Sequence, residues 1–586
     1  MTECFLSAVS GVRSGRLFAA VLVGAVLAAA PARAESTREE ISREVHKSLP
    51  MKPGQRLEVD HRNGNVHLHT HALPAVRVDA RIRVSSSDMN EARRFADAIA
   101  VDVETSSTGV SVRTRYPDEH GGSLLSGSRR VSFAVDYDIA VPETAGVSVR
   151  NRFGDVLADD LKGGTEIHNA NGRIVFRGGR GAARLENSFG SLELAGSAGE
   201  TDVVNANGAV TIADVDGPLS VRNRFGRVTI ARVKKVTFSG TNADLSLAGS
   251  GPASLTTSFG AVEVTNVAGD LSVQNTNGAV SAAGIAGEAA LSATFAAITF
   301  SDVKRGVRCT GTNARVSGRK TGGPVTVQNT FGPVELSEIG GPVDVQNSNG
   351  TVRLRDIRGA AVIRNRFGDV DASGIGGDAT VVNGNATVTL SNIDGSVDAR
   401  NSFGAVSITR AKKGIKVNSG NGSVAISDAA GPTFVKTSFG LVEAARISGD
   451  LTVENSNGAV RASDVRGFAN VRTSFSPVTL DAVTGAVEVD NQNGSVELRD
   501  LPTGPKPCGR IAVKTSFAPI RIALVDGGGY TVNARTSFGK ISSEMPLTVA
   551  GGVSSDSLQG RIGDGRCEVI VNDSNGNIDL VKQGRR

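Results

Sequence analysis

A four-residue motif recurs twenty times between Asn151 and Gly494, at a spacing of 18 residues that shortens twice to 17. Alternate copies end in Phe-Gly, as at Phe153, and in Asn-Gly, as at Asn171, or in a close variant of either. A fixed period of this length is typical of repeat proteins in which each unit buries its apolar face against its neighbours. The chain is therefore expected to form a long stack of similar units without a single globular core.

Apolar and polar residues alternate within each unit. From Val221 to Phe225, and again from Val228 to Ile230, every second residue falls on one face. This period of two indicates β-strands and not helices. Gly226, between the two runs, permits the positive φ of a tight corner. Each unit is predicted to hold two short strands and two turns, so the fold class is all-β: a parallel β-solenoid, or β-helix, of about 18-residue coils.

The length of one coil stays open at this stage, because the alternation of motifs also makes a 36-residue double unit. With 18-residue coils, Phe and Asn alternate along a single column; with 36-residue coils, each type has its own column. We favour 18. Twenty such coils at a strand spacing of about 4.8 Å predict a rod of roughly 95 Å, and 36-residue coils would halve that length.

The same alternation predicts that the first and third residues of the motif both face inward. A buried Asn needs a hydrogen-bond partner, because an unpaired buried amide costs a few kcal/mol. Stacked Asn side chains can bond to neighbouring turns and form a ladder along the axis, or each can cap its own turn. The predicted structural ladder includes Asn151, Asn169, Asn187, Asn205, Asn223, Phe153, Phe189 and Phe225.

Residues 1–34 have the pattern of a secretory signal peptide. A basic start precedes the apolar run from Leu17 to Ala30, which is too short to span a bilayer comfortably, and Ala32-Arg33-Ala34 fits the small-residue cleavage rule. No later segment is long and apolar enough to cross a membrane. The chain is therefore expected to be exported, to the periplasm, the cell surface or the exterior.

Three further segments follow the signal peptide. Residues 35–148 are expected to form a β-rich N-terminal cap that covers the first sheet edge, 149–500 the regular solenoid, and 501–586 irregular C-terminal coils with a second cap. The N-terminal cap is predicted to contain one or two short helices, at 39–49 and, from the helical spacing of its apolar residues, at 88–100.

The charge pattern disfavours nucleic acid as a partner. The chain has 64 Lys and Arg against 59 Asp and Glu, for a formal net charge of +5, and the two signs are interleaved. It has no cluster of basic residues with interleaved aromatics, a pattern typical of nucleic-acid-binding surfaces.

Three cysteines remain after the signal peptide: Cys309, Cys508 and Cys567. An oxidising compartment permits a disulfide. A bridge between Cys508 and Cys567 is one interpretation, because both fall where the repeat becomes irregular. Three free, buried thiols are the other, since a sequence alone does not give the pairing.

Histidines provide the candidate metal ligands. His67, His69 and His71 alternate on one face of a predicted strand. Imidazoles about 7 Å apart on one face are candidate ligands for a transition metal, with His61 as a further donor. The alternative is a solvated polar face, because ligands along one strand rarely close a tetrahedron unaided. The Gly-Gly-x-Gly-x-Asp series of calcium-binding solenoids is absent, and no cofactor is predicted.

Three features together resemble the bacterial "putative adhesin" β-solenoid family of uncharacterised exported repeat proteins. They are the export signal, the segment from Tyr137 to Pro142 followed by that from Val147 to Val156, and the repeated V-x-V-x-N-x-N-G-x-V pattern. The resemblance covers the chain from about Arg56 to the C-terminus. It implies the solenoid fold and surface adhesion, with some relatives linked to envelope-stress systems, and it supplies no catalytic residues.

The sequence thus predicts a non-catalytic structural scaffold or adhesin-like binding surface in the cell envelope. Recurrent catalytic neighbourhoods are not readable in the repeats, so an enzyme is not expected. The alternatives are a periplasmic scaffold or sensor component of envelope stress and, less favoured, a polysaccharide-active enzyme. The expected partner is an envelope component, a glycan or a protein, and the solenoid ends offer a route to self-association.

Overall fold

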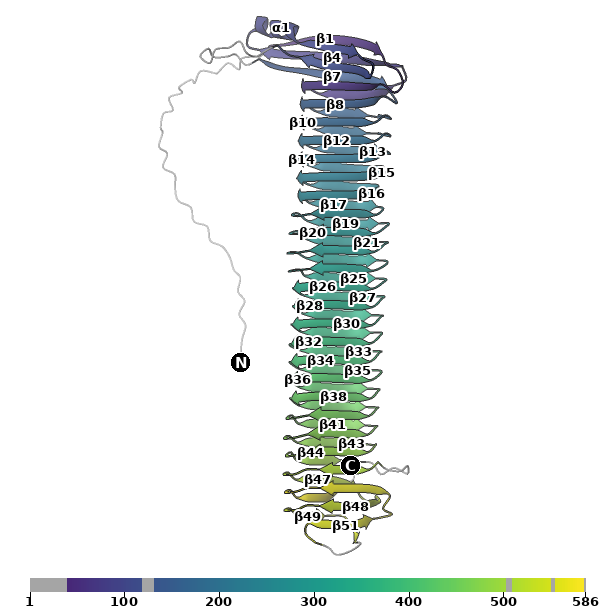
Figure 1. The fold of residues 1–586 in the computed structure, drawn as a ribbon, viewed down its shortest axis with the longest axis vertical. Helices are drawn as coiled ribbons and strands as arrows, with labels where there is room; N and C mark the ends of the chain where they lie inside the picture. The colour runs from purple at the N-terminus through teal and green to yellow at the C-terminus, as the bar shows by residue number, and fades with distance from the viewer. Residues whose placement is uncertain (1–38, 118–130, 502–508, 550–553, 584–586) are drawn as a thin grey trace, which may run out of the picture.

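The computed structural model describes residues 39–117, 131–501, 509–549 and 554–583. The predicted signal peptide, 1–34, lies outside the described residues. Figure 1 shows one long straight stack of strands with a broader cap at its N-terminal end and an irregular C-terminal end. The described residues form 53 strands and one helix, which confirms the predicted all-β solenoid.

Each coil contributes one strand to each of two parallel stacks. The first stack begins with β8 (Gly146–Phe153), β10 (Thr165–Asn171), β12 (Ala183–Phe189) and β14 (Thr201–Asn207). The second begins with β9 (Val156–Asp159), β11 (Ile174–Arg177) and β13 (Leu192–Ser197). Both continue through the long strands β15 (Val210–Phe225) and β16 (Val228–Asn242) to β44 (Val487–Asn491) and β45 (Val496–Arg499).

The strand register settles the length of the coil. Asn169 is paired with Asn151 on one side and with Asn187 on the other. Neighbouring strands are therefore 18 residues apart, and the 36-residue coil is excluded. Because the strands are parallel and in register, residues at equal positions of successive repeats form columns along the rod.

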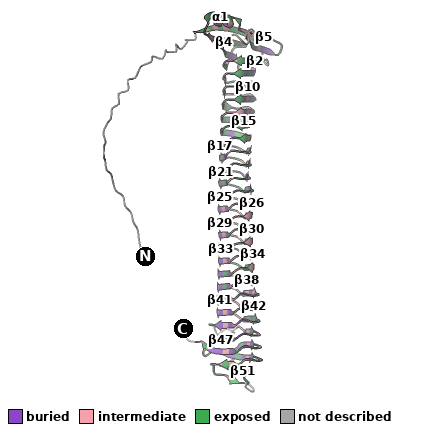
Figure 2. Cartoon of the chain, turned by 90° about the vertical axis from the view of Figure 1, so that its left-hand side faces the viewer, coloured by how far each residue is buried: buried purple, intermediate pink, exposed green. Residues whose placement is uncertain are grey.

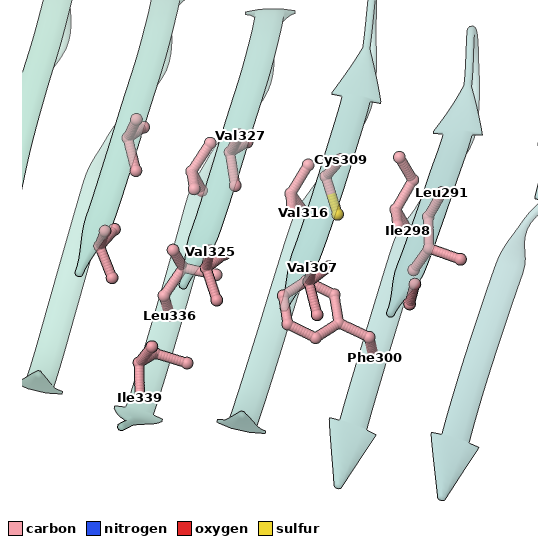
Figure 3. Packing of buried hydrophobic residues seen from close by; sticks show 14 of the residues in the cluster. Leu291, Ile298, Phe300, Val307, Cys309, Val316, Val325, Val327, Leu336 and Ile339 are labelled. Atoms are coloured by element: carbon pink, nitrogen blue, oxygen red, sulfur yellow. The ribbon is translucent and has the colours of Figure 1, made fainter. Parts of the chain in front are cut away.

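The core is a thin layer of aliphatic side chains between the two stacks. Val147 and Val149 enter it from β8, and Val156 and Ala158 enter it from β9; all four are buried. Figure 2 shows buried residues along the whole rod, and Figure 3 shows such side chains packed between the strands. The alternation of apolar and polar residues therefore orients both strands of the coil.

At one position a large aromatic side chain enters this layer beside a glycine of the next coil. Phe300 is buried and is paired in register with Gly318. A Cβ atom on Gly318 would lie 2.0 Å from the ring of Phe300. Gly318 thus provides the space that the ring occupies.

A column of residues with positive φ forms a corner at the end of the second strand. The φ angle is 59° at Asp160, 69° at Gly178 and 59° at Asp214, and the column continues to Ala482 and Asp500 with 55° and 48°. This left-handed conformation strains any residue with a Cβ atom, by about 1–2 kcal/mol. Many coils nevertheless carry a non-glycine residue there.

We expect Ala482→Gly to raise the free energy of unfolding by about 1 kcal/mol, because it removes the Cβ from a left-handed residue. Ala425→Gly is the matched control, because Ala425 is exposed in the middle of β37 (Val424–Ala429). In extended backbone the same change should lower stability by about 0.5–1 kcal/mol. Urea denaturation followed by circular dichroism measures both. Equal effects at the two positions would contradict the expectation.

The residues of the first coil precede the regular repeats in the sequence. β2 (Arg56–Asn63) pairs in parallel with β8, and β3 (Val66–His71) pairs with β9. His61 is paired with Asn151, and Asn63 with Phe153. His61 therefore occupies the ladder position of this coil.

The chain then leaves the rod and builds the cap before it returns at β8. The inserted elements are β4 (Ala75–Ser86), α1 (Met89–Ala98), β5 (Ala100–Thr105), β6 (Gly109–Arg115) and β7 (Ser132–Pro142). β6 pairs with the outer edge of β2, and β7 with the outer edge of β3. The two sheet edges of the first coil are thus covered, which prevents edge-to-edge association.

One of the two predicted helices is present and the other prediction is wrong. α1 begins after Asp88, whose side chain accepts hydrogen bonds from two backbone amides of the first turn. The segment predicted as a helix at 39–49 is instead β1 (Glu39–Pro50), antiparallel to β4. Its apolar residues recur every four positions, which fits one face of a strand as well as a helix, and pairing with β4 decides between them. Among the described residues, α1 is too short to cross a membrane, and no other helix is present.

The chain doubles back at the C-terminal end. β52 (Cys567–Asn572) lies between β46 (Ile511–Lys514) and β48 (Tyr530–Arg535), although both precede it in sequence. β53 (Ile578–Gln583) inserts in the same way between β47 (Ile520–Val525) and β49 (Ile541–Ser543). The antiparallel strand β51 (Ser557–Ile562) then closes the edge of β48.

Candidate functional site

The asparagines of the predicted ladder are buried at the corner between the two stacks. Asn151, Asn169, Asn187, Asn205 and Asn223 are all buried. Their Nδ2 atoms donate to turn carbonyls at 3.1–3.4 Å, some within the same coil and others in the preceding one. Both arrangements considered from the sequence, the ladder and the local cap, therefore occur together. This column holds adjacent coils together.

The phenylalanines of the motif do not face inward as predicted. Phe153, Phe189 and Phe225 are between 44% and 57% exposed. The alternation stops at the preceding Asn: in the first repeat, Arg152 and Phe153 are both exposed. The chain turns the corner immediately after the buried Asn, so the ring points outward before the positive φ of the following Gly.

These rings form an exposed column along one edge of the rod. Asn171 is paired with Phe153 on one side and with Phe189 on the other, so rings alternate with polar side chains. Successive rings are two coils apart, about 9.6 Å at the usual strand spacing. The Phe column comprises Phe153, Phe189, Phe225, Phe259, Phe295, Phe331, Phe367, Phe403, Phe439 and Phe475, and exposed Phe517 and Phe538 continue the motif in the irregular coils.

A compact group of ligating side chains lies where the first coil meets the cap. His67 and His69 of β3 and Asp138 of β7 place one ligating atom each within 4.8 Å of one another. The Nδ1 atoms of His67 and His69 lie 3.2 and 3.1 Å from the same oxygen, Asp138 Oδ1. The two imidazole rings are 5.3 Å apart, closer than the strand repeat would place them. We call these three residues the His–Asp cluster.

The other two predicted metal ligands are elsewhere. His71 Nε2 donates to the backbone carbonyl of Ala75 at 2.7 Å, and His71 is not part of the cluster. His61 lies on β2, buried, with Nδ1 3.0 Å from Thr114 Oγ1 and its ring edge-on to Tyr137. Burial lowers the pKa of His61 to about 4. Of the three alternate histidines, two lie in the cluster, and the third ring turns toward the following loop.

Asp138 is the residue that the sequence did not indicate. It lies 71 positions after His67 and 69 after His69, and joins them only because β7 pairs with β3, with Asp138 opposite His67. Asp159, one coil further along, places Oδ2 3.2 Å from Nε2 of His67. The alternation in the segment from Tyr137 to Pro142 marks Asp138 as outward-facing, but its partner strand is not encoded locally.

Two further reactive groups have structural roles. His168 lies between Glu166 and Glu186, with contacts of 3.0 and 2.5 Å, and its hydrogen bond with Glu166 lowers the pKa of that carboxyl. Cys309 is buried in the core, where burial raises the pKa of its thiol far above the usual range. A thiol of this kind is unreactive.

The predicted bridge between Cys508 and Cys567 stays a prediction. Cys508 lies outside the described residues. Cys567 begins β52, is buried and takes part in a disulfide.

Comparisons with known proteins find similarity to solved structures, at low sequence identity. No protein family matches the chain, and no curated protein matches it. One similar solved structure is a "putative cell adhesion protein" from Clostridium sporogenes, with 9% identity over 38% of this chain and 99% of that one, and a TM-score of 0.17. Another is a "putative adhesin" from Bacteroides fragilis, with 12% identity over 49% of this chain and 97% of that one, and a TM-score of 0.14. Both descriptions agree with the family that the sequence resembles, but scores this low carry no argument about function.

Proposed function

We propose that the chain is an exported, non-catalytic scaffold whose Phe column is an adhesin-like binding surface for an extended glycan of the cell envelope. The exposed column carries this proposal. A single exposed aromatic residue is unremarkable, but a regularly spaced line of them along one edge indicates an interaction surface. The rings are held on a rigid sheet corner, so binding orders few side chains.

The periodicity of the column selects the kind of partner. Apolar rings recur at about 9.6 Å, and the intervening column positions carry Asn, which donates and accepts hydrogen bonds. A linear glycan offers the matching pattern, because each sugar has an apolar C–H face for a ring and hydroxyl groups for an amide. The spacing is comparable to the length of a disaccharide in an extended chain. Many weak contacts along the rod would add through multivalency.

The binding test compares two triple variants of the full mature chain in co-sedimentation with isolated peptidoglycan. Replacing Phe295, Phe331 and Phe367 by Ser should weaken binding at least tenfold, since each ring loses stacking worth about 0.5–1.5 kcal/mol. Because the rings are half exposed, thermal stability should change little. The matched control replaces the exposed Thr211, Thr299 and Thr389 by Ala, and should bind as the parent does.

Two other outcomes would reject this function. If the Phe variant loses self-association in sedimentation velocity and keeps glycan binding, the column binds a second copy of the chain. If incubation with the chain depolymerises the glycan, the protein is an enzyme. Protease treatment of intact cells then locates it: cleavage indicates the cell surface, and protection indicates the periplasm.

A further inference from the structure

We infer that the His–Asp cluster binds one divalent transition-metal ion of the zinc class, which joins the first coil of the solenoid to its cap. His67 and His69 are two residues apart on β3, so both face outward on the same side of the strand. Asp138 is opposite His67 on the neighbouring strand β7. Two adjacent strands therefore present three ligands at one point.

Two of the three distances between the ligating atoms match a tetrahedral ion. With zinc–ligand bonds of about 2.0–2.1 Å, two ligands of one tetrahedron are roughly 3.3 Å apart. The two distances from histidine Nδ1 to Asp138 Oδ1 are 3.2 and 3.1 Å. Two imidazole nitrogens and one carboxylate oxygen are a donor set suited to zinc and its neighbours, not to calcium or magnesium. The cluster is partly exposed, so water can complete the fourth position.

Both Nδ1 atoms lie at ion-pair distance from the Asp138 carboxylate. Nδ1 of His69 is enclosed and makes no hydrogen bond, although it lies 3.1 Å from the carboxylate. On the far side of its ring, His67 Nε2 contacts the carboxylate of Asp159 at 3.2 Å. This is the usual arrangement of a metal-bound histidine, in which the second nitrogen donates to a carboxylate and directs the first toward the ion.

Binding should stabilise the N-terminal end of the rod. The ligands come from β3, which belongs to the first coil, and from β7, which is the last of the inserted cap elements. An ion bound by both strands holds the cap on the sheet edge that it covers. Removing the ion with a chelator should therefore lower the melting temperature of the cap without unfolding the regular coils.

The test uses the full mature chain without a histidine tag, stripped of metal and titrated with Zn²⁺ in a calorimeter. We expect one ion per chain. His69→Ala and Asp138→Ala should each weaken binding at least tenfold, and Asp159→Asn, which preserves the size of the side chain, about tenfold or more. His71→Ala is the matched control: it lies on the same strand and outside the cluster, and should change the affinity less than twofold.

Cobalt provides an independent readout. Co²⁺ in a tetrahedral site with two nitrogen donors should give visible absorption bands that His69→Ala abolishes and His71→Ala retains. Circular dichroism shows whether each variant is folded. If His69→Ala does not fold, Asp159→Asn takes its place in the comparison with His71→Ala. The inference is overturned if the parent chain releases no heat with Zn²⁺, or if His71→Ala weakens binding as much as His69→Ala does.

Discussion

Asn365→Asp should lower the free energy of unfolding by roughly 3–5 kcal/mol at neutral pH. The side chain of Asn365 is buried, and its Nδ2 donates to Gly350 O at 3.2 Å and Gly368 O at 2.9 Å. One carbonyl belongs to the preceding coil and the other to its own. A carboxylate would place negative charge against both carbonyl oxygens in a site closed to water.

Asn365→Thr is the matched control for this prediction. Thr437 holds the same position of the motif, paired with Asn455 of the next coil, and its hydroxyl donates to Phe439 O at 3.2 Å. The column therefore tolerates a hydroxyl donor. Asn365→Thr should lower the free energy of unfolding by less than about 1 kcal/mol. Urea denaturation measures both variants. Hydrogen exchange should also show lost protection near Asn365 first, because coils in a solenoid contact only their neighbours. Equal losses in the two variants would show that packing, not donor chemistry, sets the cost.

The period of the motif was sufficient to predict the fold. Parallel stacking requires units of equal length with apolar residues at equal positions, and both are visible in the chain. The coil length was not decided by the period, because 18 and 36 both fit the alternating motifs. Only the register, in which Asn169 lies between Asn151 and Asn187, distinguishes them.

The candidate sites were harder to predict because they depend on where strands end and which strands pair. Period-two alternation assigned Phe153 to the same face as Asn151 and gave no sign that the corner falls between them. The first coil carried a visible signal: His61-Arg62-Asn63-Gly64 is a copy of the motif with His in place of the first Asn. Asp138 had no such signal, since its position beside His67 results from an insertion that returns to the rod.

His61 should make the N-terminal end of the rod sensitive to acid. Its ring is buried, its Nε2 is enclosed without a hydrogen bond, and Tyr137 packs edge-on at 4.8 Å. Burial lowers its pKa from 6.5 to about 4. Between these values the unfolded chain binds a proton that the folded chain does not, so the free energy of unfolding falls as pH decreases. The stabilisation is fully present above about pH 6.5 and decreases by about 3 kcal/mol as pH approaches 4.

His61→Asn isolates this contribution, because Asn is the residue that the next coil carries at the same position, paired with His61 in register. Other carboxylates titrate in the same range, so the quantity of interest is the difference between parent and variant. Between pH 7.5 and pH 4.5, the free energy of unfolding of the parent should fall by about 2–3 kcal/mol more than that of the variant. Urea denaturation at a series of pH values, with hydrogen exchange to locate the change in the cap, measures it. Parallel stability curves for the two proteins would mean that His61 is protonated in the folded chain as readily as in the unfolded one.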